Sequence, residues 1–355
     1  MALCVKGIKG KKEVMLETKI FHTNEIKEAA EKIREGECVS FPTETVYGLG
    51  ADALNETAVS KVYQAKGRPS DNPLIVHVSS KAEVAKYAKT VPAVAEKLMS
   101  AFWPGPLTLI FQVKEDVFAP TVTAGLNSVA MRMPNNEATL QLIKEAGTPL
   151  VGPSANTSGK PSPTTAEHVY HDLKGNIAGI LDDGETGVGL ESTVLDITDP
   201  SRPAILRPGG VSKEALEQVI GTVYVDAHLV SADEVPKAPG MKYKHYSPEE
   251  PVVIVDGDDK VWEEAIAFYQ HKGEKIGLLA NEDRIARLQS DDLIPFSLGK
   301  EGNIEMAAHR LFAGLRYFET TNATLILAEA FPEKGLGIAY MNRLKKAAGA
   351  HFFGE

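Results

Sequence analysis

The feature that most constrains the fold of this chain is an abrupt change of pattern at residues 231–251, SADEVPKAPGMKYKHYSPEEP. This segment holds four prolines and shows neither helical nor strand periodicity, which is typical of a linker between domains. A chain of 355 residues is also too long for a single ordinary hydrophobic core. We therefore predict one domain at 14–230, a linker at 231–250 and a second domain at 251–355.

The second domain shows a regular alternation of strand and helix patterns. Strand-like runs occur at 251–255, 275–280, 293–297 and 323–330, and helix-like runs follow them at 260–271, 282–290, 304–319 and 337–348. Such alternation favours a small parallel α/β domain of Rossmann-like type. Nothing in this part of the sequence indicates a binding site.

The first domain mixes its elements less regularly. Helix patterns occur at 24–35, 56–66, 91–102, 136–147 and 164–173, and strand patterns at 37–41, 73–78, 107–113, 128–133 and 192–197. Because several strands follow one another directly, we predict a mixed α/β sheet of irregular topology rather than a doubly wound one.

One glycine motif in the first domain resembles the sequence fingerprint of dinucleotide-binding folds. Gly48, Gly50 and Ala53 fit the pattern G-x-G-x-x-A. That fingerprint requires an acidic residue at the end of the next strand, and this strand ends in Ser79 and Ser80. We interpret the two glycines as flanking a tight turn.

Composition excludes several classes of protein. A formal net charge of −10 argues against a protein that coats nucleic acid non-specifically. Two cysteines, Cys4 and Cys38, cannot build a disulfide framework. No signal peptide and no membrane-spanning run is recognisable, so we expect a cytoplasmic protein without membrane contact.

The run KGRPSDNPLIVHV at 66–78 carries the first candidate site. Lys66, Arg68, Ser70 and Asn72 recur at every second residue, and alternate side chains of an extended segment share one face. An ammonium, a guanidinium, a hydroxyl and an amide would together bind phosphate. The alternative is a solvated cationic turn. His77, inside the following apolar strand, is more often a satisfied core histidine than a ligand.

Further polar groups stand at strand ends of the first domain. Thr45 lies in the hydroxyl-rich run FPTETVYGLG, and Ser154 and Asn156 lie in a loop ahead of a helix. Arg132 interrupts an apolar strand, where a buried guanidinium needs an anionic partner. Together with Ser192 and Arg207, this set favours charge neutralisation around phosphates, as phosphoryl or nucleotidyl transfer requires.

Eight motifs make the chain resemble the YrdC/Sua5 family over nearly its whole length. They are PTETVYGLG (42–50), KGRPSDNPLIVHV (66–78), PGPLT (104–108), VAMRMP (129–134), PSANTSGKPSPT (153–164), ESTVLD (191–196), LRPGG (206–210) and PGMKYKHYSP (239–248). The resemblance implies an open twisted mixed sheet with a large basic cavity, followed by the C-terminal Rossmann-like α/β domain of the longer Sua5 type.

The resemblance also implies a reaction and its partners. L-threonine, bicarbonate and ATP would give threonylcarbamoyl-AMP and pyrophosphate with Mg²⁺, a nucleotidyltransferase activity. The product would pass to a separate transferase machinery for the t6A modification at position 37 of tRNAs that read ANN codons. Weak RNA binding is a further expectation. The sequence leaves the metal ligands and the oligomeric state open.

The resemblance implies roles for the residues that match the family's motifs, and these residues form three sets. The catalytic set is Lys66 and Arg68. The threonine set is Thr45, His77, Arg132 and Ser192. The ATP set is Arg68, Asn72, Ser128, Ser154, Asn156, Ser162, Arg207 and Tyr243.

Two roles are open for the linker, and two other functions compete with the synthase activity. Tyr243, His245 and Tyr246 suggest a strip that covers the cavity mouth, and the alternative is a linker that only packs its aromatic rings on the surface. Related domains occur in carbamoyl-transfer proteins that mature hydrogenases, but those carry zinc-finger segments for which two cysteines do not suffice. An RNA-binding regulator would need a basic, aromatic-rich stripe that we do not find.

Overall fold

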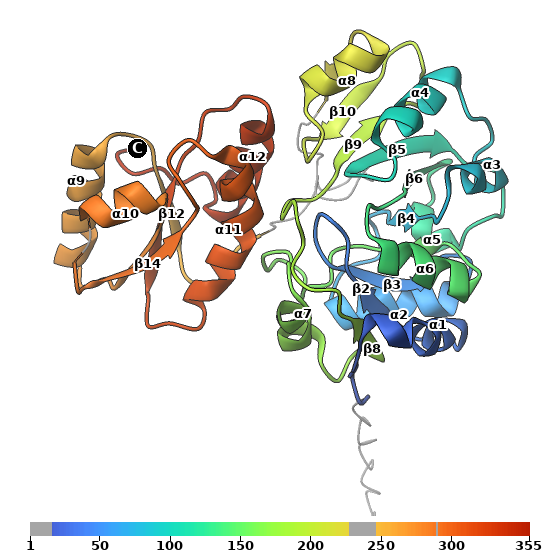
Figure 1. The fold of residues 1–355 in the computed structure, drawn as a ribbon, viewed down its shortest axis with the longest axis horizontal. Helices are drawn as coiled ribbons and strands as arrows, with labels where there is room; N and C mark the ends of the chain where they lie inside the picture. Colours follow the sequence, from blue (N-terminus) through green and yellow to red (C-terminus); the bar gives the residue numbers. More distant parts are fainter. Residues whose placement is uncertain (1–15, 227–245, 289) are drawn as a thin grey trace, which may run out of the picture.

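The chain forms two separate sheets, one of eleven strands before the predicted linker in the sequence and one of four strands after it (Figure 1). The structure is a computed structural model that describes residues 16–226 and 246–355 apart from 289. The predicted boundaries at 230 and 250 stay predictions, because 227–245 lies outside the described residues. Within the described residues, no helix is both long and apolar enough to span a bilayer.

The first sheet has eleven strands in the order β1-β8-β2-β3-β7-β4-β6-β5-β9-β10-β11. In chain order they are β1 (Lys19–Phe21), β2 (Val39–Phe41), β3 (Gly48–Asp52), β4 (Ile75–His77), β5 (Leu107–Gln112), β6 (Ser128–Arg132), β7 (Leu150–Val151), β8 (Gly179–Leu181), β9 (Thr193–Asp196), β10 (Ala204–Arg207) and β11 (Tyr224–Val225). The sheet contains both parallel pairs, such as β4 with β6, and antiparallel pairs, such as β5 with β6. The predicted mixed sheet is confirmed.

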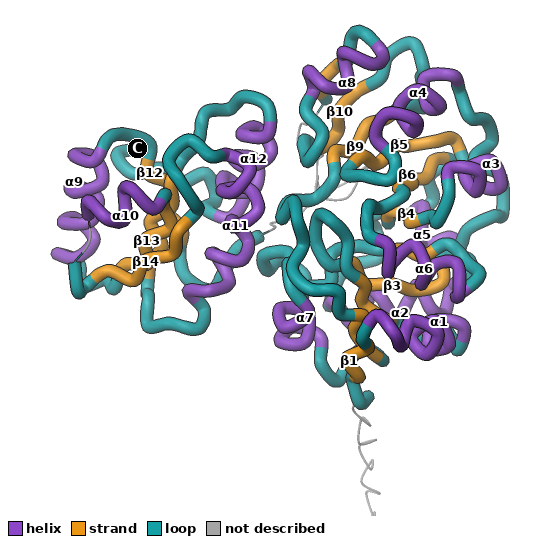
Figure 2. The backbone as a smooth tube through the Cα atoms, viewed as in Figure 1, coloured by secondary structure: helices purple, strands orange, loops and turns teal. Residues whose placement is uncertain are grey.

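Helices cover this sheet and join its strands (Figure 2). They are α1 (Ile26–Arg34), α2 (Glu56–Lys66), α3 (Val84–Tyr87), α4 (Ala93–Phe102), α5 (Pro120–Thr123), α6 (Glu137–Ala146), α7 (Ala166–Leu173) and α8 (Lys213–Ile220), with short 3-10 helices at Thr23–Glu25 and Lys81–Glu83. The helix predicted at 24–35 is confirmed as α1, and its residues Ile26, Ala29, Ala30 and Ile33 form a buried apolar stripe.

The second sheet has four parallel strands in the order β12-β15-β13-β14. Its elements alternate as β12 (Val252–Val255), α9 (Asp259–His271), β13 (Ile276–Ala280), α10 (Glu282–Leu288), β14 (Leu293–Ser297), α11 (Ile304–Phe318), β15 (Leu325–Glu329) and α12 (Leu336–Ala347). Every strand and helix predicted here is confirmed. Helices α11 and α12 lie on the side of this sheet that faces the first domain (Figure 1).

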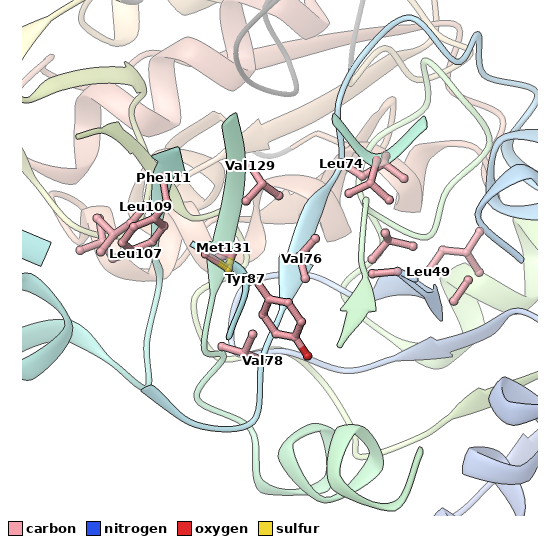
Figure 3. Packing of buried hydrophobic residues seen from close by; sticks show 14 of the residues in the cluster. Leu49, Leu74, Val76, Val78, Tyr87, Leu107, Leu109, Phe111, Val129 and Met131 are labelled. Carbon is pink, nitrogen blue, oxygen red and sulfur yellow. The ribbon is translucent and has the colours of Figure 1, made fainter. Parts of the chain in front are cut away.

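Apolar side chains from neighbouring strands form the main core of the first domain. Figure 3 shows Val76 from β4, Leu109 from β5 and Met131 from β6 lying close together in this cluster. All three are fully buried. Burying such side chains contributes roughly 1.5–3 kcal/mol each, which holds the strands that carry the polar groups described below.

The interpretation of Gly48 and Gly50 as flanking a tight turn is wrong. Both glycines lie inside strand β3, which pairs with β2. A side chain at either position would press on the Phe41 ring, and at Gly50 also on the Val39 carbonyl. The glycines therefore make room for a phenylalanine on the neighbouring strand, a contact between strands that a local pattern does not reveal.

The two domains share a continuous apolar contact. Val46 and Leu190 of the first domain belong to the same buried cluster as Leu311 and Phe312 of α11. Gly189 lies beside them, and a Cβ atom there would overlap the backbone of His309. The backbone of one domain thus touches a helix of the other without an intervening side chain.

Replacing Gly189 by alanine should weaken this contact. The new methyl group would overlap the α11 backbone, and Gly189 has a φ of +75°, which disfavours any side chain. We expect the thermal midpoint to fall by several degrees, measured by calorimetry. Gly187→Ala is the matched control, because nothing lies within 4 Å of a Cβ atom there. An equal loss in both variants would contradict the assignment of this contact.

Candidate active site

Polar side chains from separate strands line one cavity on the first domain. Its empty volume is about 630 Å³, open solvent at the mouth included, within the roughly 300–1,000 Å³ usual for small-molecule sites. The lining residues are Thr45, Val46, Arg68, Ile75, His77, Arg132, Gly152, Pro153, Ser154, Asn156, Lys160, Ser162, Glu191, Ser192, Arg207 and Tyr246. The cavity thus brings together most of the predicted site residues.

Sheet register places His77 beside Arg132. The parallel pairing of β4 with β6 makes these two residues partners, so both side chains leave the sheet on the same face. The Arg132 guanidinium is 4% exposed. It donates from Nε to the Gly105 carbonyl at 3.2 Å and from Nη1 to Thr45 Oγ1 at 2.8 Å. The predicted need of this buried arginine for an anionic partner is met by Glu44, whose Oε2 lies 2.6 Å from Nη2.

His77 is a neutral histidine at physiological pH. Burial, followed by the charge of Arg132, lowers the pKa of His77 to about 3. Its ring packs edge-on against Phe41 at 5.2 Å between ring centres. A Cβ atom at Gly152 would lie 2.6 Å from two atoms of the imidazole, so a glycine is needed for the ring to fit. Nδ1 is buried and has no hydrogen-bond partner among the described residues.

The prediction that Lys66, Arg68, Ser70 and Asn72 share one face is wrong. Lys66 is the last residue of helix α2, and Gly67 ends that helix in the left-handed conformation with φ +62°. The run is therefore a helix end followed by a turn, and the two-residue period of an extended segment does not apply. Arg68 reaches the cavity, Ser70 is exposed beside a separate shallow depression, and Asn72 is buried outside both.

The Lys66 amine binds the loop that follows β7. Its Nζ donates to the carbonyls of Ser154 and Asn156, the latter at 2.7 Å. Burial, followed by the charge of Arg68, lowers the pKa of Lys66 well below its usual range. Lys66 is not among the cavity-lining residues, and its amine holds the backbone that presents Ser154 and Asn156 to the cavity.

Arg68 is half-buried at the edge of the cavity. Its guanidinium lies 5.8 Å from the centre of the Tyr63 ring, and Nη2 donates to the Asn72 carbonyl at 3.3 Å. The Tyr63 hydroxyl donates to the same carbonyl at 2.9 Å. The side-chain amide of Asn72 is buried with no hydrogen-bond partner among the described residues.

Two hydroxyls and an arginine lie together where Ser192 and Arg207 line the cavity. Arg207, from the end of β10, donates to the Ser192 carbonyl at 3.0 Å and to its hydroxyl at 3.2 Å. Ser192 Oγ also lies 2.8 Å from Thr108 Oγ1. Burial lowers the pKa of Arg207 to about 10, so the guanidinium keeps its charge at neutral pH.

Besides Asn72, two further predicted ATP residues are not among the described cavity-lining residues. Ser128 starts β6, roughly 13 Å along that strand from Arg132, and does not line the cavity. Tyr243 lies outside the described residues. Tyr246, which is described, lines the cavity and stacks on Phe312 of α11 with 5.2 Å between ring centres.

Sequence reasoning missed Glu191 and Arg343. The Glu191 side chain is 8% exposed, and its Oε1 accepts a hydrogen bond from Ser162 Oγ at 2.6 Å. Its Oε2 lies 2.9 Å from Nε of Arg343, which comes from α12 of the other domain. Burial alone would raise the pKa of Glu191, but the charges of Arg343 and Arg207 and the Ser162 hydrogen bond lower it to about 2. The available signal was Arg343 on the apolar face of its helix, at helical spacing from the buried Ala339, Tyr340 and Ala347.

The donor set of the cavity does not suit a protein-held Mg²⁺. Magnesium prefers carboxylate and water oxygens, and Glu191 is the one carboxylate among the described cavity-lining residues. Both of its oxygens already have partners. No group of three or more histidine, cysteine, aspartate or glutamate side chains suits a metal within 16–226 and 246–355.

Comparisons with known proteins find the same family over about nine-tenths of the chain. Residues 31–209 match the Sua5/YciO/YrdC family model, described as telomere recombination, and 211–349 match the model described as threonylcarbamoyl-AMP synthase, C-terminal domain. Threonylcarbamoyl-AMP synthase of Bacillus subtilis is 50% identical over 92% of this chain and 93% of its own length. The Pyrococcus abyssi protein of the same name is 47% identical over 91% of this chain and 94% of its own.

A solved structure has the same fold as this chain over most of its length. The crystal structure of P. abyssi Sua5 complexed with L-threonine superposes with a TM-score of 0.88 at 45% identity, covering 94% of this chain and 99% of that one. Both domains and their order are therefore shared with that protein. The chain belongs to the Sua5/YciO/YrdC family, in its longer form with the C-terminal Sua5 domain.

Proposed function

We propose that this protein is a threonylcarbamoyl-AMP synthase, which joins L-threonine, bicarbonate and ATP. The observation that carries the proposal is the cavity itself, which Arg68, Arg132 and Arg207 line from separate segments together with hydroxyl-bearing side chains. Two relatives of this name share 47–50% identity over at least nine-tenths of this chain. The fold of a relative solved with L-threonine supports the amino-acid substrate.

Threonine binds at the end of β4 and β6. Arg132 has five N–H donors, and its described contacts with Gly105, Thr45 and Glu44 use three of them. Two remain for the carboxylate of threonine, a charge-assisted pairing. Neutral His77 and the hydroxyls of Thr45 and Ser192 complete the site and can hydrogen-bond the amine and hydroxyl of the substrate.

ATP occupies the rest of the cavity. Arg68 and Arg207 face the phosphates with the Ser154, Asn156 and Ser162 side chains, while Asn72, Ser128 and Tyr243 stay predicted ATP contacts without described cavity contact. Lys66 supports the site through the carbonyls of Ser154 and Asn156. Its direct contact with the phosphates is a prediction that would require the amine to leave those carbonyls.

The reaction needs positioning and charge neutralisation rather than a protein nucleophile. Bicarbonate takes up a proton and loses water to give CO₂. The neutral amine of threonine then forms an N–C bond with the CO₂ carbon and releases a proton, which gives a carbamate. A carbamate oxygen then attacks the α-phosphorus in line. The bond from that phosphorus to the bridging oxygen breaks, and pyrophosphate leaves with its charge offset by Arg68. Mg²⁺ enters with ATP as part of the substrate, and no step is assigned to it.

The product is a reactive adenylate, from which a second enzyme can take the threonylcarbamoyl group. We propose that it supplies the threonylcarbamoyl group of t6A at position 37 of tRNAs that read ANN codons. Transfer to tRNA takes place in separate machinery, and weak RNA binding by this chain stays a prediction.

The proposed function predicts strict dependence on both small substrates. Pyrophosphate release from ATP should require threonine and bicarbonate together, because attack on the α-phosphorus follows carbamate formation. Omitting each in turn in a coupled pyrophosphate assay should lower the rate at least about a hundredfold. Release that ignores both omissions would identify a general ATPase and contradict the proposal.

Arg68→Ala should lower turnover by two orders of magnitude or more while the fold stays intact. The variant loses the cation that offsets charge on the leaving pyrophosphate, and Arg68 belongs to no strand or helix. Steady-state rates and far-UV circular dichroism test this. Arg202→Ala, an exposed arginine over the Tyr224 ring, is the matched control and should keep wild-type kinetics. Near-wild-type pyrophosphate release by Arg68→Ala would refute the role.

Arg132→Lys should affect threonine more than ATP. The lysine keeps a charge for Glu44 but loses the planar fork that pairs with a carboxylate. We expect KM for threonine to rise about 10- to 100-fold, with KM for ATP within a few-fold of wild type. Initial rates with each substrate varied in turn provide the measurement, and equal changes in both constants would argue against a threonine carboxylate at Arg132.

A further inference from the structure

A single acidic side chain stands among the cations of the cavity. Glu191 is the one carboxylate among the described cavity-lining residues, which also include Arg68, Arg132, Lys160 and Arg207. An unpaired carboxylate at this depth would repel a triphosphate strongly, because charges a few ångströms apart interact by several kcal/mol where water is scarce. A nucleotide site can contain this residue only if its charge is neutralised from within the protein.

The neutralising charge comes from the other domain. Arg343 of α12 is fully buried, and its Nε lies 2.9 Å from Glu191 Oε2. Its Nη1 donates to the Pro208 carbonyl at 2.6 Å. Its guanidinium also lies 5.8 Å from the centre of the Tyr246 ring, which itself lines the cavity. The Arg343 guanidinium thus contacts the cavity wall of the first domain at three residues.

Arg343 holds two chain segments that each carry a site residue. Glu191 precedes Ser192, and Pro208 follows Arg207. Arg207 and Ser192 are hydrogen-bonded to each other, and the backbone at Gly209 approaches Ser192 too closely for a Cβ atom. The Arg343 guanidinium therefore contacts both segments at once. Ser162 is held by the other carboxylate oxygen of Glu191.

We propose that Arg343 is a positioning residue of the nucleotide site: it cancels the charge of Glu191 and fixes the wall that carries Ser162, Ser192 and Arg207. The site is consequently complete only when the C-terminal domain is docked. The inference rests on the proposed function to the extent that ATP occupies this cavity. It assigns to the second domain, in which the sequence shows no site, a direct electrostatic part in nucleotide binding.

A second interdomain pair provides a matched control. Arg316 of α11 is also buried and pairs with Asp172 of α7 through two nitrogens, at 3.0 and 2.9 Å. It also donates to the Pro161 carbonyl at 2.6 Å, so it holds the same two domains together. Neither Arg316 nor Asp172 lines the cavity. Losing Arg316 would weaken docking without exposing a carboxylate to the nucleotide.

The test measures binding of the non-hydrolysable analogue α,β-methylene-ATP by calorimetry, using the full-length chain. Arg343→Met should raise its Kd at least about tenfold, because Glu191 loses its ion-pair partner and stays charged. Adding Glu191→Gln to Arg343→Met should recover most of that loss. A purely structural role for Arg343 would not be repaired by removing the charge of its partner. The double variant binding no better than Arg343→Met alone would overturn the proposal.

Two further variants keep the result interpretable if Arg343→Met unfolds. Arg343→Lys keeps the charge but not the fork, so it should bind the analogue within about threefold of wild type even if its thermal midpoint falls. Arg316→Met should gain nothing from added Glu191→Gln, and an equal gain there would overturn the specific role of Arg343. Pyrophosphate release by the wild-type chain tests the proposed function separately, because the analogue reports nucleotide binding without chemistry.

Discussion

The burial of positive charge in one cavity is the constraint on which the rest of the structure depends. Arg132 and Arg207 line the cavity, Lys66 binds the backbone of the lining residues Ser154 and Asn156, and all three are nearly inaccessible to solvent. A buried cation is costly unless polar groups surround it, and each of these has at least two acceptors within reach. Backbone carbonyls of Gly105, Ser192 and Asn156 accept from them, so loops without regular structure are fixed by the cations they surround. The same contacts keep the cations in place without a ligand.

The partners of these cations divide the cavity into two electrostatic regions. Arg132 is balanced by the Glu44 carboxylate, so an incoming carboxylate meets a site whose charge is already partly satisfied. Arg207 donates to the carbonyl oxygen and the hydroxyl of one residue, Ser192, and these two dipoles carry no net charge that would cancel that of the guanidinium. This difference suits a site that takes a singly charged amino-acid carboxylate at one end and a triphosphate at the other.

The C-terminal domain belongs to this electrostatic arrangement through its helices rather than its sheet. Helices α11 and α12 each send one buried arginine across to the first domain, and the apolar side chains around them join the two cores. Buried ion pairs of this kind contribute little net stability but require a specific geometry. They therefore fix how the domains dock, and that docking sets the wall behind Ser192 and Arg207.

The sequence by itself determined the two α/β architectures, every element of the second domain, and the segments that meet at the site. Hydrophobic period and local motifs carry that information, because both reflect neighbours along the chain. Only the tertiary structure decided that Lys66 turns to backbone carbonyls, that Gly48 and Gly50 lie in a strand beneath Phe41, and that Arg343 neutralises Glu191. Arg343 and Glu191 are 152 residues apart. No local pattern records such a contact, since it exists only once both domains are folded and docked.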